Sequence, residues 1–409
     1  MSRLFGTDGI RGVANEYPLT AEAVFGIGRA VALFFGGSSI PTKIIIGKDT
    51  RQSGDMIEDA LASGICSVGA DPCLAGILPT PAVAYLTSST DASAGIVISA
   101  SHNPFYDNGI KIFDADGYKL SDSKEDEIER LLPANSIDHS EGKSNHRLGN
   151  VETLKDAPER YLAFLQKTLP DAGRFNGMKI VLDCSNGATY AVAPKLFRDF
   201  GAQVEAINIS PDGKNINADC GSEHPETLID TVLAKKADIG LAFDGDGDRL
   251  VAVDEKGLVI SGDRTLVICA RSLKRKGLLK NNLVISTVMS NLGMRLALKE
   301  LGINHIMSPV GDRYVLEQMN ANGAVIGGED SGHMIFLDQH TTGDGMLTAM
   351  RLIQTMCDEN KPLSELSRVM AVFPQFLLNI DVQKKPAIED VPEIMAAIRS
   401  VEDLSLIHI

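Results

Sequence analysis

The stretch Asp238–Arg249 reads DIGLAFDGDGDR, an apolar run that ends in three aspartates separated by glycines. Two other stretches have the same form: Ala94–Pro104 reads AGIVISASHNP, and Gly323–His333 reads GAVIGGEDSGH. The short apolar runs predict buried strands, and each leads into an unusual polar loop. The chain therefore has the pattern of one unit repeated three times. The predicted strands are Ala94–Ser99, Asp238–Phe243 and Gly323–Ile326.

Each unit also opens with a predicted strand. The opening runs are Lys43–Gly47 (KIIIG), Lys179–Asp183 (KIVLD) and the LVIST run from Leu283, and each is followed by a helix-like stretch and a second strand. Strands alternating with helices indicate α/β domains with buried, largely parallel strands. Ligands of such sheets bind beyond the carboxyl ends of the strands, so we expect chemistry in ASHNP, DGDGDR and GGEDSGH. The alternative is that three α/β domains share this pattern by chance.

Polar stretches divide the chain. The run Pro133–Val151 is typical of a linker, and further breaks fall near Glu255–Gly257 and Asn360–Ser364. The predicted fold is α/β, with three similar domains of mixed, largely parallel sheets at residues 1–150, 151–255 and 256–368. The residues after Arg368 are too few for another domain and form only a fragment of one.

Composition restricts the class of protein. The 409 residues carry a formal net charge of −15, which argues against nucleic acid as the main partner. An anionic substrate stays possible if Arg and Lys side chains converge locally. No run is long and apolar enough to span a membrane, and the N-terminus has no apolar signal region. The 6 cysteines are scattered without a C-x-x-C pair, which favours reduced thiols in the cytoplasm.

The DGDGDR loop indicates a metal site. Asp244, Asp246 and Asp248 can bend inward onto one hard cation, and without a cation their charges would repel strongly. An EF-hand is a rival interpretation, because Glu255 stands at the twelfth position of that pattern. However, Arg249 occupies the sixth position, which needs glycine, and the flanks resemble strands. A solvated turn is the remaining alternative. Three carboxylates leave room for water or phosphate oxygens, as magnesium prefers.

The SASHNP loop contains a candidate nucleophile or phosphate carrier. Ser101 follows an apolar strand, with His102 beside it and Lys111 ten residues further on. Serine is a weak nucleophile that needs activation, and no Ser–His–Asp triad is forced here. The alternative is that these residues cap a helix that follows the strand.

The GEDSGH loop offers hydrogen-bonding groups to a polar ligand. Glu329, Ser331 and His333 can bind vicinal hydroxyls or an amine, although a polar surface turn is the alternative. Arg11, after FGTDGI, and Arg249 could offset the charge of a substrate phosphate, and each could equally be a solvated arginine.

Together these segments resemble the α-D-phosphohexomutase superfamily. Five motifs occur in order over nearly the whole chain: FGTDGIRG (Phe5–Gly12), SASHNP (Ser99–Pro104), NGIKIF (Asn108–Phe113), DGDGDR (Asp244–Arg249) and GEDSGH (Gly328–His333). Within the superfamily, VGDRYVLE (Val310–Glu317) and TTGDG (Thr341–Gly345) are similar to the bacterial branch that acts on glucosamine phosphates.

The resemblance implies a phosphoryl-transfer mechanism. Ser101 would carry a phosphate, and one Mg2+ would bridge it to Asp244, Asp246 and Asp248. The phosphoryl group would pass to glucosamine 6-phosphate, the resulting 1,6-bisphosphate would reorient, and glucosamine 1-phosphate would leave towards UDP-N-acetylglucosamine. Positioning and charge neutralisation dominate such reactions.

The resemblance also implies roles for the other candidate residues. Lys111 is similar in position to the acid/base lysine, and proton transfer would require a lowered pKa, which a nearby cation can supply. His102 would assist, Arg249 would share the neutralisation of charge, and Arg11 resembles the N-terminal active-site arginine. The loop with Glu329, Ser331 and His333 would bind the sugar in either orientation. By analogy the protein would be a homodimer.

One feature of the superfamily is absent. Its members end in a fourth domain with an R-x-S-G-T-E-P loop that binds the distal phosphate, and this chain has no such loop. We therefore expect residues 369–409 to be the truncated start of that domain. Two other functions stay open: a sister mutase for mannose or glucose phosphates, and an inactive remnant that binds a sugar phosphate or a metal.

Overall fold

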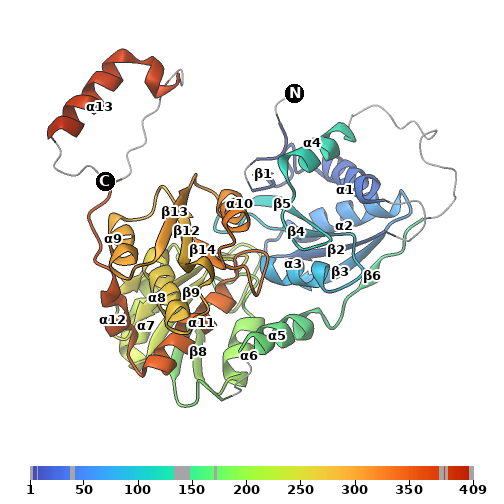
Figure 1. The fold of residues 1–409 in the computed structure, drawn as a ribbon. Helices are drawn as coiled ribbons and strands as arrows, with labels where there is room; N and C mark the ends of the chain where they lie inside the picture. The colour runs from blue at the N-terminus through green and yellow to red at the C-terminus, as the bar shows by residue number, and fades with distance from the viewer. Residues whose placement is uncertain are drawn as a thin grey trace. The chain divides into compact units, whose positions relative to one another are not determined.

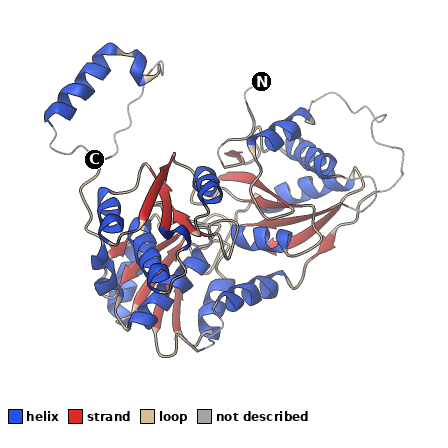
Figure 2. Ribbon diagram, in the orientation of Figure 1, coloured by secondary structure: helices blue, strands red, loops and turns tan. Residues whose placement is uncertain are grey.

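The computed structural model describes residues 3–6, 8–36, 42–132, 148–169, 173–376, 382 and 386–404. They belong to two compact units, Met1–Val372 and Phe373–Ile409. The first unit contains three sheets with helices around them (Figures 1 and 2). In the second unit the structure describes a 3-10 turn, Ile388–Asp390, and helix α13, Pro392–Leu404.

The first sheet has six strands in the order β1-β5-β4-β2-β3-β6. Its strands are β1 Ile10–Val13, β2 Lys43–Lys48, β3 Asp71–Ile77, β4 Ala94–Ile98, β5 Asp107–Asp114 and β6 Glu152–Thr153. The helices of this region are α1 Ala21–Phe35, α2 Gly54–Cys66, α3 Thr80–Ser88, α4 Asp122–Arg130 and α5 Ala157–Thr168.

The second and third sheets have five and four strands, in the orders β11-β10-β9-β7-β8 and β13-β12-β14-β15. The strands are β7 Lys179–Asp183, β8 Gln203–Ile207, β9 Ile239–Phe243, β10 Leu250–Asp254, β11 Val259–Ile260, β12 Leu283–Thr287, β13 Asn304–Ser308, β14 Ile326–Gly328 and β15 Met334–Phe336. The helices are α6 Val192–Asp199, α7 Glu226–Lys235, α8 Gly262–Arg275, α9 Leu292–Glu300, α10 Asp312–Asn322, α11 Gly345–Glu359 and α12 Leu363–Leu366, with 3-10 turns at Lys280–Asn282 and Ser367–Val369.

The three sheets share one topology. In each, the opening strand (β2, β7 or β12) pairs in parallel with a neighbour on both sides. The strand after the polar loop (β5, β10 or β15) then pairs antiparallel with the strand before that loop. This arrangement confirms the predicted α/β fold of three similar, mixed sheets. It also places ASHNP, DGDGDR and GEDSGH at equivalent positions.

Apolar residues alternate between the two faces of each sheet. On β2, Ile44 and Ile46 pack into the cluster that contains α1 and α2, whereas Ile45 packs into the cluster that contains α3. Successive side chains of a strand point to opposite faces of the sheet. A strand whose isoleucines point both ways, such as KIIIG, therefore needs helices on both faces. Figure 1 shows α1 and α2 on one face of this sheet and α3 on the other.

One predicted strand was misplaced. The prediction assigned Gly323–Ile326, but β14 begins only at Ile326. Gly323 instead ends α10 in the left-handed conformation, with φ of 65°. This conformation is favourable for glycine at a helix end, so the apolar residues directly after it connect the helix to the strand.

The helix-capping alternative for the SASHNP loop was wrong, because the element that comes after this loop is a strand. The loop leads into β5, which pairs antiparallel with β4. The polar residues of the loop therefore have no helix N-terminus to cap, so helix capping does not explain why they occur there.

The domain boundaries stay a prediction. The strand β6 lies just beyond the boundary predicted at residue 150, yet it pairs with β3 of the first sheet. Most of the predicted linker, residues 133–147, lies outside the described residues. Among the described residues, none of the helices is both long enough and apolar enough to cross a bilayer.

The crossing of α1 and α2 depends on two glycines. A Cβ atom on Gly64 would lie 2.1 Å from the carbonyl oxygen of Phe25, and one on Gly28 would lie 2.4 Å from that of Leu61. Real side chains do not tolerate such distances to backbone atoms, so the two helices can approach this closely only with glycine at both positions.

We predict that Gly64→Ala lowers the free energy of unfolding by about 1–3 kcal/mol, because the added methyl group forces α1 and α2 apart. The control is Gly26→Ala on α1, where a Cβ atom would find its nearest neighbour, Leu132, at 4.0 Å. That change should leave stability equal or raise it by about 0.4–1 kcal/mol. Urea denaturation of both variants measures the difference, and equal stabilities would contradict this account of the crossing.

Candidate active site

The three equivalent loops meet in one place. A Cβ atom on Gly245 of the DGDGDR loop would lie 2.6 Å from the carbonyl oxygen of Ser101, so the first two loops touch at this glycine. The third loop lies alongside, because the backbone N–H of Leu250 donates to Gly332 O at 3.1 Å. Three loops far apart in the sequence thus form one site.

The aspartates of the DGDGDR loop form a buried carboxylate cluster. One oxygen from each of Asp244, Asp246 and Asp248 lies within 4.8 Å of the others. Between them, Gly247 has φ of 71°, a backbone conformation that L side chains rarely adopt. The EF-hand alternative was wrong, because the loop joins two antiparallel strands, β9 and β10, rather than two helices.

The cluster has the donor set for a hard cation. Asp246 Oδ1 and Asp248 Oδ1 are buried and accept no hydrogen bond from any described residue. Buried carboxylate oxygens usually accept hydrogen bonds, so these two oxygens are available to bind a cation, with Arg249 Nε the charged group 3.9 Å from Asp248 Oδ1. The three residues present are therefore suitable ligands for a metal ion.

The carboxylates perturb one another's titration. Burial and the neighbouring charges of Asp248 and Asp246 raise the pKa of Asp244 well above its ordinary value. Burial would also raise the pKa of Asp248, but Lys111 and His333 outweigh it and lower that pKa well below the ordinary value. Strong opposite shifts within one loop are typical of a functional cluster.

Ser101 points directly at this cluster. Its hydroxyl donates to Asp244 Oδ2 at 2.6 Å, and its side chain is almost fully buried. His102 Nδ1 lies 3.3 Å from the same hydroxyl. Burial, followed by the charge of Arg249, lowers the pKa of His102, so its imidazole is neutral near pH 7. A neutral imidazole beside the hydroxyl is able to accept a proton.

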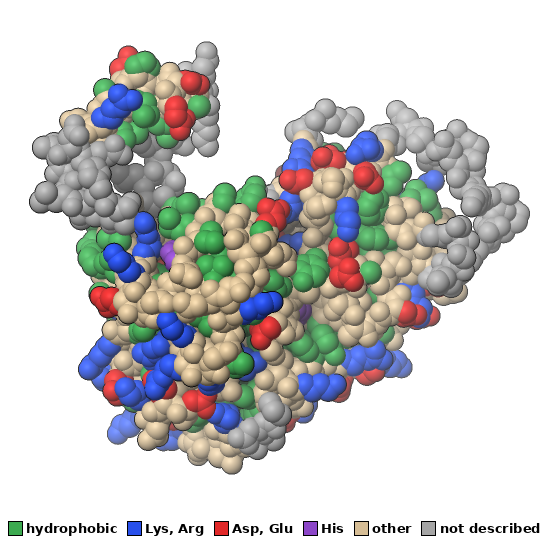
Figure 3. All heavy atoms as spheres, viewed as in Figure 1, with side chains coloured by type: hydrophobic (Ala, Val, Ile, Leu, Met, Phe, Trp, Pro, Cys, Tyr) green, Lys and Arg blue, Asp and Glu red, His purple; other side chains and the backbone are tan. Residues whose placement is uncertain are grey.

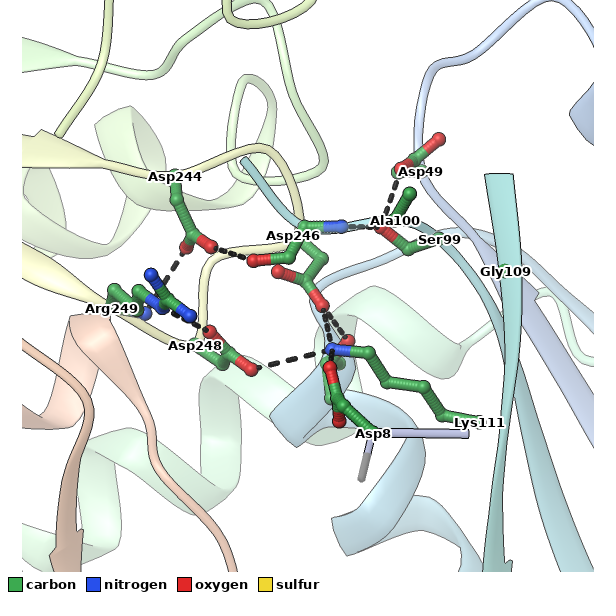
Figure 4. A network of polar contacts seen from close by, with 12 residues as sticks. Asp8, Asp49, Ser99, Ala100, Gly109, Lys111, Asp244, Asp246, Asp248 and Arg249 are labelled. Atoms are coloured by element: carbon green, nitrogen blue, oxygen red, sulfur yellow. Dashed lines mark hydrogen bonds and ion pairs between the residues drawn. The ribbon is translucent and has the colours of Figure 1, made fainter. Parts of the chain in front are cut away.

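Lys111 reaches the cluster from β5. Its ammonium lies 2.8 Å from Asp246 Oδ2, 3.2 Å from Asp8 Oδ2 and 3.6 Å from Asp248 Oδ2 (Figure 4). The lowering of its pKa by a bound cation stays a prediction. Burial does act to lower the pKa of Lys111, but these three carboxylates raise it well above the ordinary value. Lys111 is therefore a buried cation here.

The two candidate arginines have different surroundings. Arg249 donates its backbone N–H to Asp244 Oδ1 at 3.1 Å, and its Nε lies 3.9 Å from Asp248 Oδ1. Arg11 donates from Nη1 to Ala100 O at 3.3 Å and forms an ion pair with Asp8. The Arg11 side chain thus borders the loop of the candidate nucleophile, and Arg249 borders the carboxylate cluster.

Basic groups converge locally although the chain is acidic overall. Figure 3 shows Lys and Arg side chains intermixed with Asp and Glu over the visible face of the first unit. Inside the site four basic side chains converge, and each lies next to a carboxylate: Arg11, Lys111, Lys119 and Arg249. Such a concentration of cations suits an anionic ligand.

The GEDSGH loop brings one side chain to the carboxylate cluster and holds two others nearby. His333 Nδ1 lies 3.6 Å from Asp248 Oδ2, and burial, which would lower the pKa of His333, is outweighed by Asp248, so the pKa is raised. Glu329 Oε1 instead accepts the backbone N–H of Gly311 at 3.0 Å. The Ser331 hydroxyl is buried and has no hydrogen-bond partner among the described residues.

The sequence reasoning missed a chain of charges beside the site. Asp8 lies between Arg11, Lys111 and Lys119, with its Oδ1 2.5 Å from the Lys119 ammonium. Lys119 also pairs with Asp312, whose Oδ2 lies 3.6 Å from His333 Nε2. Asp8 belongs to the FGTDGIRG segment and Asp312 to VGDRYVLE, so both motifs contained a signal. Nothing in the local sequence singled out Lys119.

Two uncharged residues were also missed. Thr80, at the start of α3, donates its hydroxyl to Asp246 Oδ2 at 2.6 Å and its N–H to Asp246 O at 2.8 Å. Asn217, from the second sheet's region, donates its side-chain amide to Ser101 O at 2.9 Å. Neither lies in a recognisable pattern, because each acts on a residue more than 100 positions away.

A neutral histidine connects the third sheet's region to α3. The His340 imidazole donates from Nε2 to Pro81 O at 2.9 Å and accepts the backbone N–H of Thr341 at Nδ1, at 2.8 Å. The Pro81 carbonyl can only accept, which fixes the proton on Nε2. Burial lowers the pKa of His340 to about 4, although the Pro81 carbonyl acts in the opposite direction.

Known proteins similar to this chain come from one family. The sequence models of phosphoglucomutase/phosphomannomutase alpha/beta/alpha domains I, II and III match residues 2–137, 159–257 and 261–373. A protein of Syntrophus aciditrophicus named phosphoglucosamine mutase is 57% identical over 403 residues, covering 98% of this chain and 90% of that protein. One of Syntrophobacter fumaroxidans with the same name is 54% identical over 402 residues, covering 98% and 89%.

A solved structure has the same fold. The crystal structure of a phosphoglucomutase/phosphomannomutase family protein from Burkholderia thailandensis superimposes with a TM-score of 0.77 at 27% sequence identity. The match covers 90% of this chain and 80% of that one.

We predict a pH-dependent contribution of His340 to stability. The folded pKa is about 4, below the unfolded value near 6.5, so the unfolded chain binds the extra proton first as pH falls. Stability should therefore decrease between pH 7 and pH 5 by roughly 2 kcal/mol more in the wild type than in His340→Gln. Urea denaturation at both pH values measures this, and a pH-independent difference would show that His340 is not buried and neutral.

Proposed function

Because this chain belongs to the phosphoglucomutase/phosphomannomutase family of isomerases, we propose that it converts glucosamine 6-phosphate to glucosamine 1-phosphate through a phosphate on Ser101. The observation that carries this proposal is the 2.6 Å hydrogen bond from the Ser101 hydroxyl to Asp244 in the buried carboxylate cluster. The name phosphoglucosamine mutase of relatives that cover nearly the whole chain supports the choice of sugar.

The cation in this proposal is Mg2+. Asp244, Asp246 and Asp248 would hold it together with an oxygen of the Ser101 phosphate, since all of these are hard oxygen donors. When bound, Mg2+ neutralises negative charge on the phosphoryl group and so makes the phosphorus more open to attack. The oxygens of Asp246 and Asp248 that accept no hydrogen bond from a described residue support a ligand role for both.

Phosphoryl transfer from Ser101 breaks the bond between phosphorus and Oγ and forms a bond to the free hydroxyl oxygen of the sugar phosphate. We assign to His102 the role of taking the proton of that hydroxyl, because its neutral imidazole lies 3.3 Å from the Ser101 hydroxyl. Lys111 enters as a cation and neutralises the charge that develops on Oγ, while Arg249 shares this task on the phosphoryl oxygens. The 1,6-bisphosphate then reorients in the site, and its other phosphate is transferred to Ser101 by the reverse step.

Sugar recognition is assigned to the GEDSGH loop, with Arg11 on the substrate phosphate. The Ser331 hydroxyl is free to bind a sugar hydroxyl, and the Glu329 carboxylate can pair with the glucosamine ammonium group. His333 connects this loop to Asp248, so the proposed sugar site lies next to the proposed metal site. A loop with both donors and acceptors suits a ligand that must bind in two orientations.

We predict that Ser101→Ala lowers kcat by at least about 10³-fold, the scale of losing a covalent carrier. Intact mass measurement should show one phosphoryl group on the wild type, removable by glucosamine 6-phosphate, and none on the variant. The control is Ser272→Ala, a buried serine on α8 that should keep both phosphate and activity.

The mass measurement also separates the enzyme from an inactive remnant. A wild type that never carries phosphate, even after incubation with glucosamine 1,6-bisphosphate, would exclude the phosphoserine route. Retained mutase activity in Ser101→Ala would exclude it as well.

We predict that glucosamine 6-phosphate is the preferred substrate over mannose 6-phosphate and glucose 6-phosphate. A coupled assay of kcat/KM with the three sugars measures this preference. Glu329→Gln should reduce it by about 10-fold or more, because the ammonium group loses a charge-assisted partner. Higher kcat/KM for mannose or glucose phosphate would instead identify a sister mutase.

A further inference from the structure

Beneath the loop of Ser101 lies a buried ion pair between Asp49 and Arg51, neither of which has a role in the proposed reaction. Asp49 and Arg51 come directly after β2, and their side chains have no exposed surface. Arg51 Nε donates to Asp49 Oδ2 at 2.8 Å, and Arg51 N donates to Asp49 Oδ1 at 2.9 Å. A buried ion pair often contributes little to stability, because desolvation offsets the attraction. Its presence at this place therefore needs another explanation.

The guanidinium group of Arg51 binds the backbone of the loop that comes after β4. Nη2 donates to Ser101 O and Asn103 O, both at 2.8 Å. Nη1 donates to Asp107 O at 3.1 Å and also contacts Pro104 O. One planar group with donors in a fixed arrangement thus sets the positions of four carbonyl groups of the loop.

Asp49 acts on the backbone N–H of Ser101 through the Ser99 hydroxyl. The Ser99 hydroxyl donates to Asp49 Oδ2 at 2.5 Å and accepts the backbone N–H of Ser101 at 3.0 Å. Figure 4 shows Asp49 and Ser99 on the side of the loop away from Asp244. The N–H of Ser101 is therefore bound through Ser99 to Asp49, and its carbonyl is bound to Arg51.

The conformation held in this way is an unfavourable one. Ser101 has φ of 53°, in the left-handed region that residues other than glycine seldom adopt. Such a residue persists only where its surroundings determine its conformation, and these cases are concentrated at functional sites. From this conformation the Ser101 hydroxyl reaches Asp244.

We propose that Arg51 and Asp49 are positioning residues, which hold Ser101 in the left-handed conformation that presents its hydroxyl to the carboxylate cluster. This inference rests on the proposed role of Ser101 as phosphoryl carrier. The side-chain contacts of both residues are to the backbone of the loop, to the Ser99 hydroxyl and to each other. Both act through the backbone of the loop and the Ser99 hydroxyl.

The test compares Arg51→Lys with Arg271→Lys in the full chain. Lysine keeps the charge at position 51 but cannot bind four carbonyl groups in a plane. Arg271 on α8 pairs with Glu359 at 3.1 Å and serves as the matched loss of an arginine–carboxylate contact away from the site. We expect Arg51→Lys to lose about 10²-fold in kcat, the scale of a misplaced reacting group, with little change in KM. Arg271→Lys should keep wild-type kinetics.

Hydrogen exchange gives a readout that does not depend on activity. The amides of residues 99–107 should exchange faster in Arg51→Lys than in the wild type, and those of the second and third sheets should not. Ser99→Ala is the milder variant in case Arg51→Lys does not fold. It removes only the hydroxyl between Asp49 and the Ser101 N–H, and it should lower kcat by about 10-fold, the scale of one lost hydrogen bond.

Three outcomes are distinct. Wild-type phosphorylation of Ser101 together with low kcat and fast exchange in both loop variants supports the inference. Wild-type phosphorylation with full kcat and unchanged exchange in Arg51→Lys and Ser99→Ala overturns it and leaves the proposed function intact. A wild type that never accepts phosphate from glucosamine 1,6-bisphosphate overturns the proposed function and removes the basis of the inference with it.

Discussion

The mutual repulsion of three buried carboxylates is the constraint that governs the rest of the site. With oxygens of Asp244, Asp246 and Asp248 within 4.8 Å of one another, each pair of charges opposes folding by roughly 3 kcal/mol at an effective dielectric constant near 20. Lys111 and Arg249 supply two positive charges against three negative ones. A divalent cation would reverse the remaining negative charge and so favour the binding of an anionic phosphate. Burial, followed by the charges of Asp248 and Asp246, raises the pKa of Asp244, while attraction to the carboxylates outweighs burial at Lys111 and keeps it a cation.

The repeated topology explains how so many groups reach one point. Each of the three sheets ends a parallel strand, turns through a polar loop and returns antiparallel, so the loops are equivalent by construction. The loops differ in chemistry: one contains the Ser101 hydroxyl, one the three carboxylates, and one Glu329, Ser331 and His333, to which sugar binding is proposed. Gly245 permits the closest contact between the first two, because any side chain there would meet the Ser101 carbonyl. The glycines of DGDGDR are therefore needed for packing between loops as well as for the turn.

The segments VGDRYVLE and TTGDG lie where the first and third sheets' regions meet. Arg313 donates to Glu125 at 2.7 Å and to Leu120 O at 3.0 Å, both near α4. Thr341 donates its hydroxyl to Gly117 O at 2.6 Å. Asp312 continues this contact inward, through Lys119 on one side and His333 on the other. These segments thus connect the GEDSGH loop to the loops of the first sheet, and TTGDG also contacts the DGDGDR loop, where the Gly345 N–H donates to Gly247 O at 3.1 Å.

Features that depend on neighbouring residues could be predicted from the amino-acid order alone. Alternating strands and helices indicated the three α/β units, and the spacing of Asp244, Asp246 and Asp248 indicated the carboxylate cluster, because both are local patterns. The start of β14 was missed because the left-handed Gly323 ends the preceding helix so late.

Which distant groups surround each charge is set by the tertiary structure. Asp8, next to Lys111, precedes β1, and Arg51, beneath Ser101, follows β2, so both lie far from their partners in the sequence and no local pattern shows that they meet. The carboxylates that raise the pKa of Lys111 were not foreseen for the same reason, since electrostatic energy depends on separation in space and on burial.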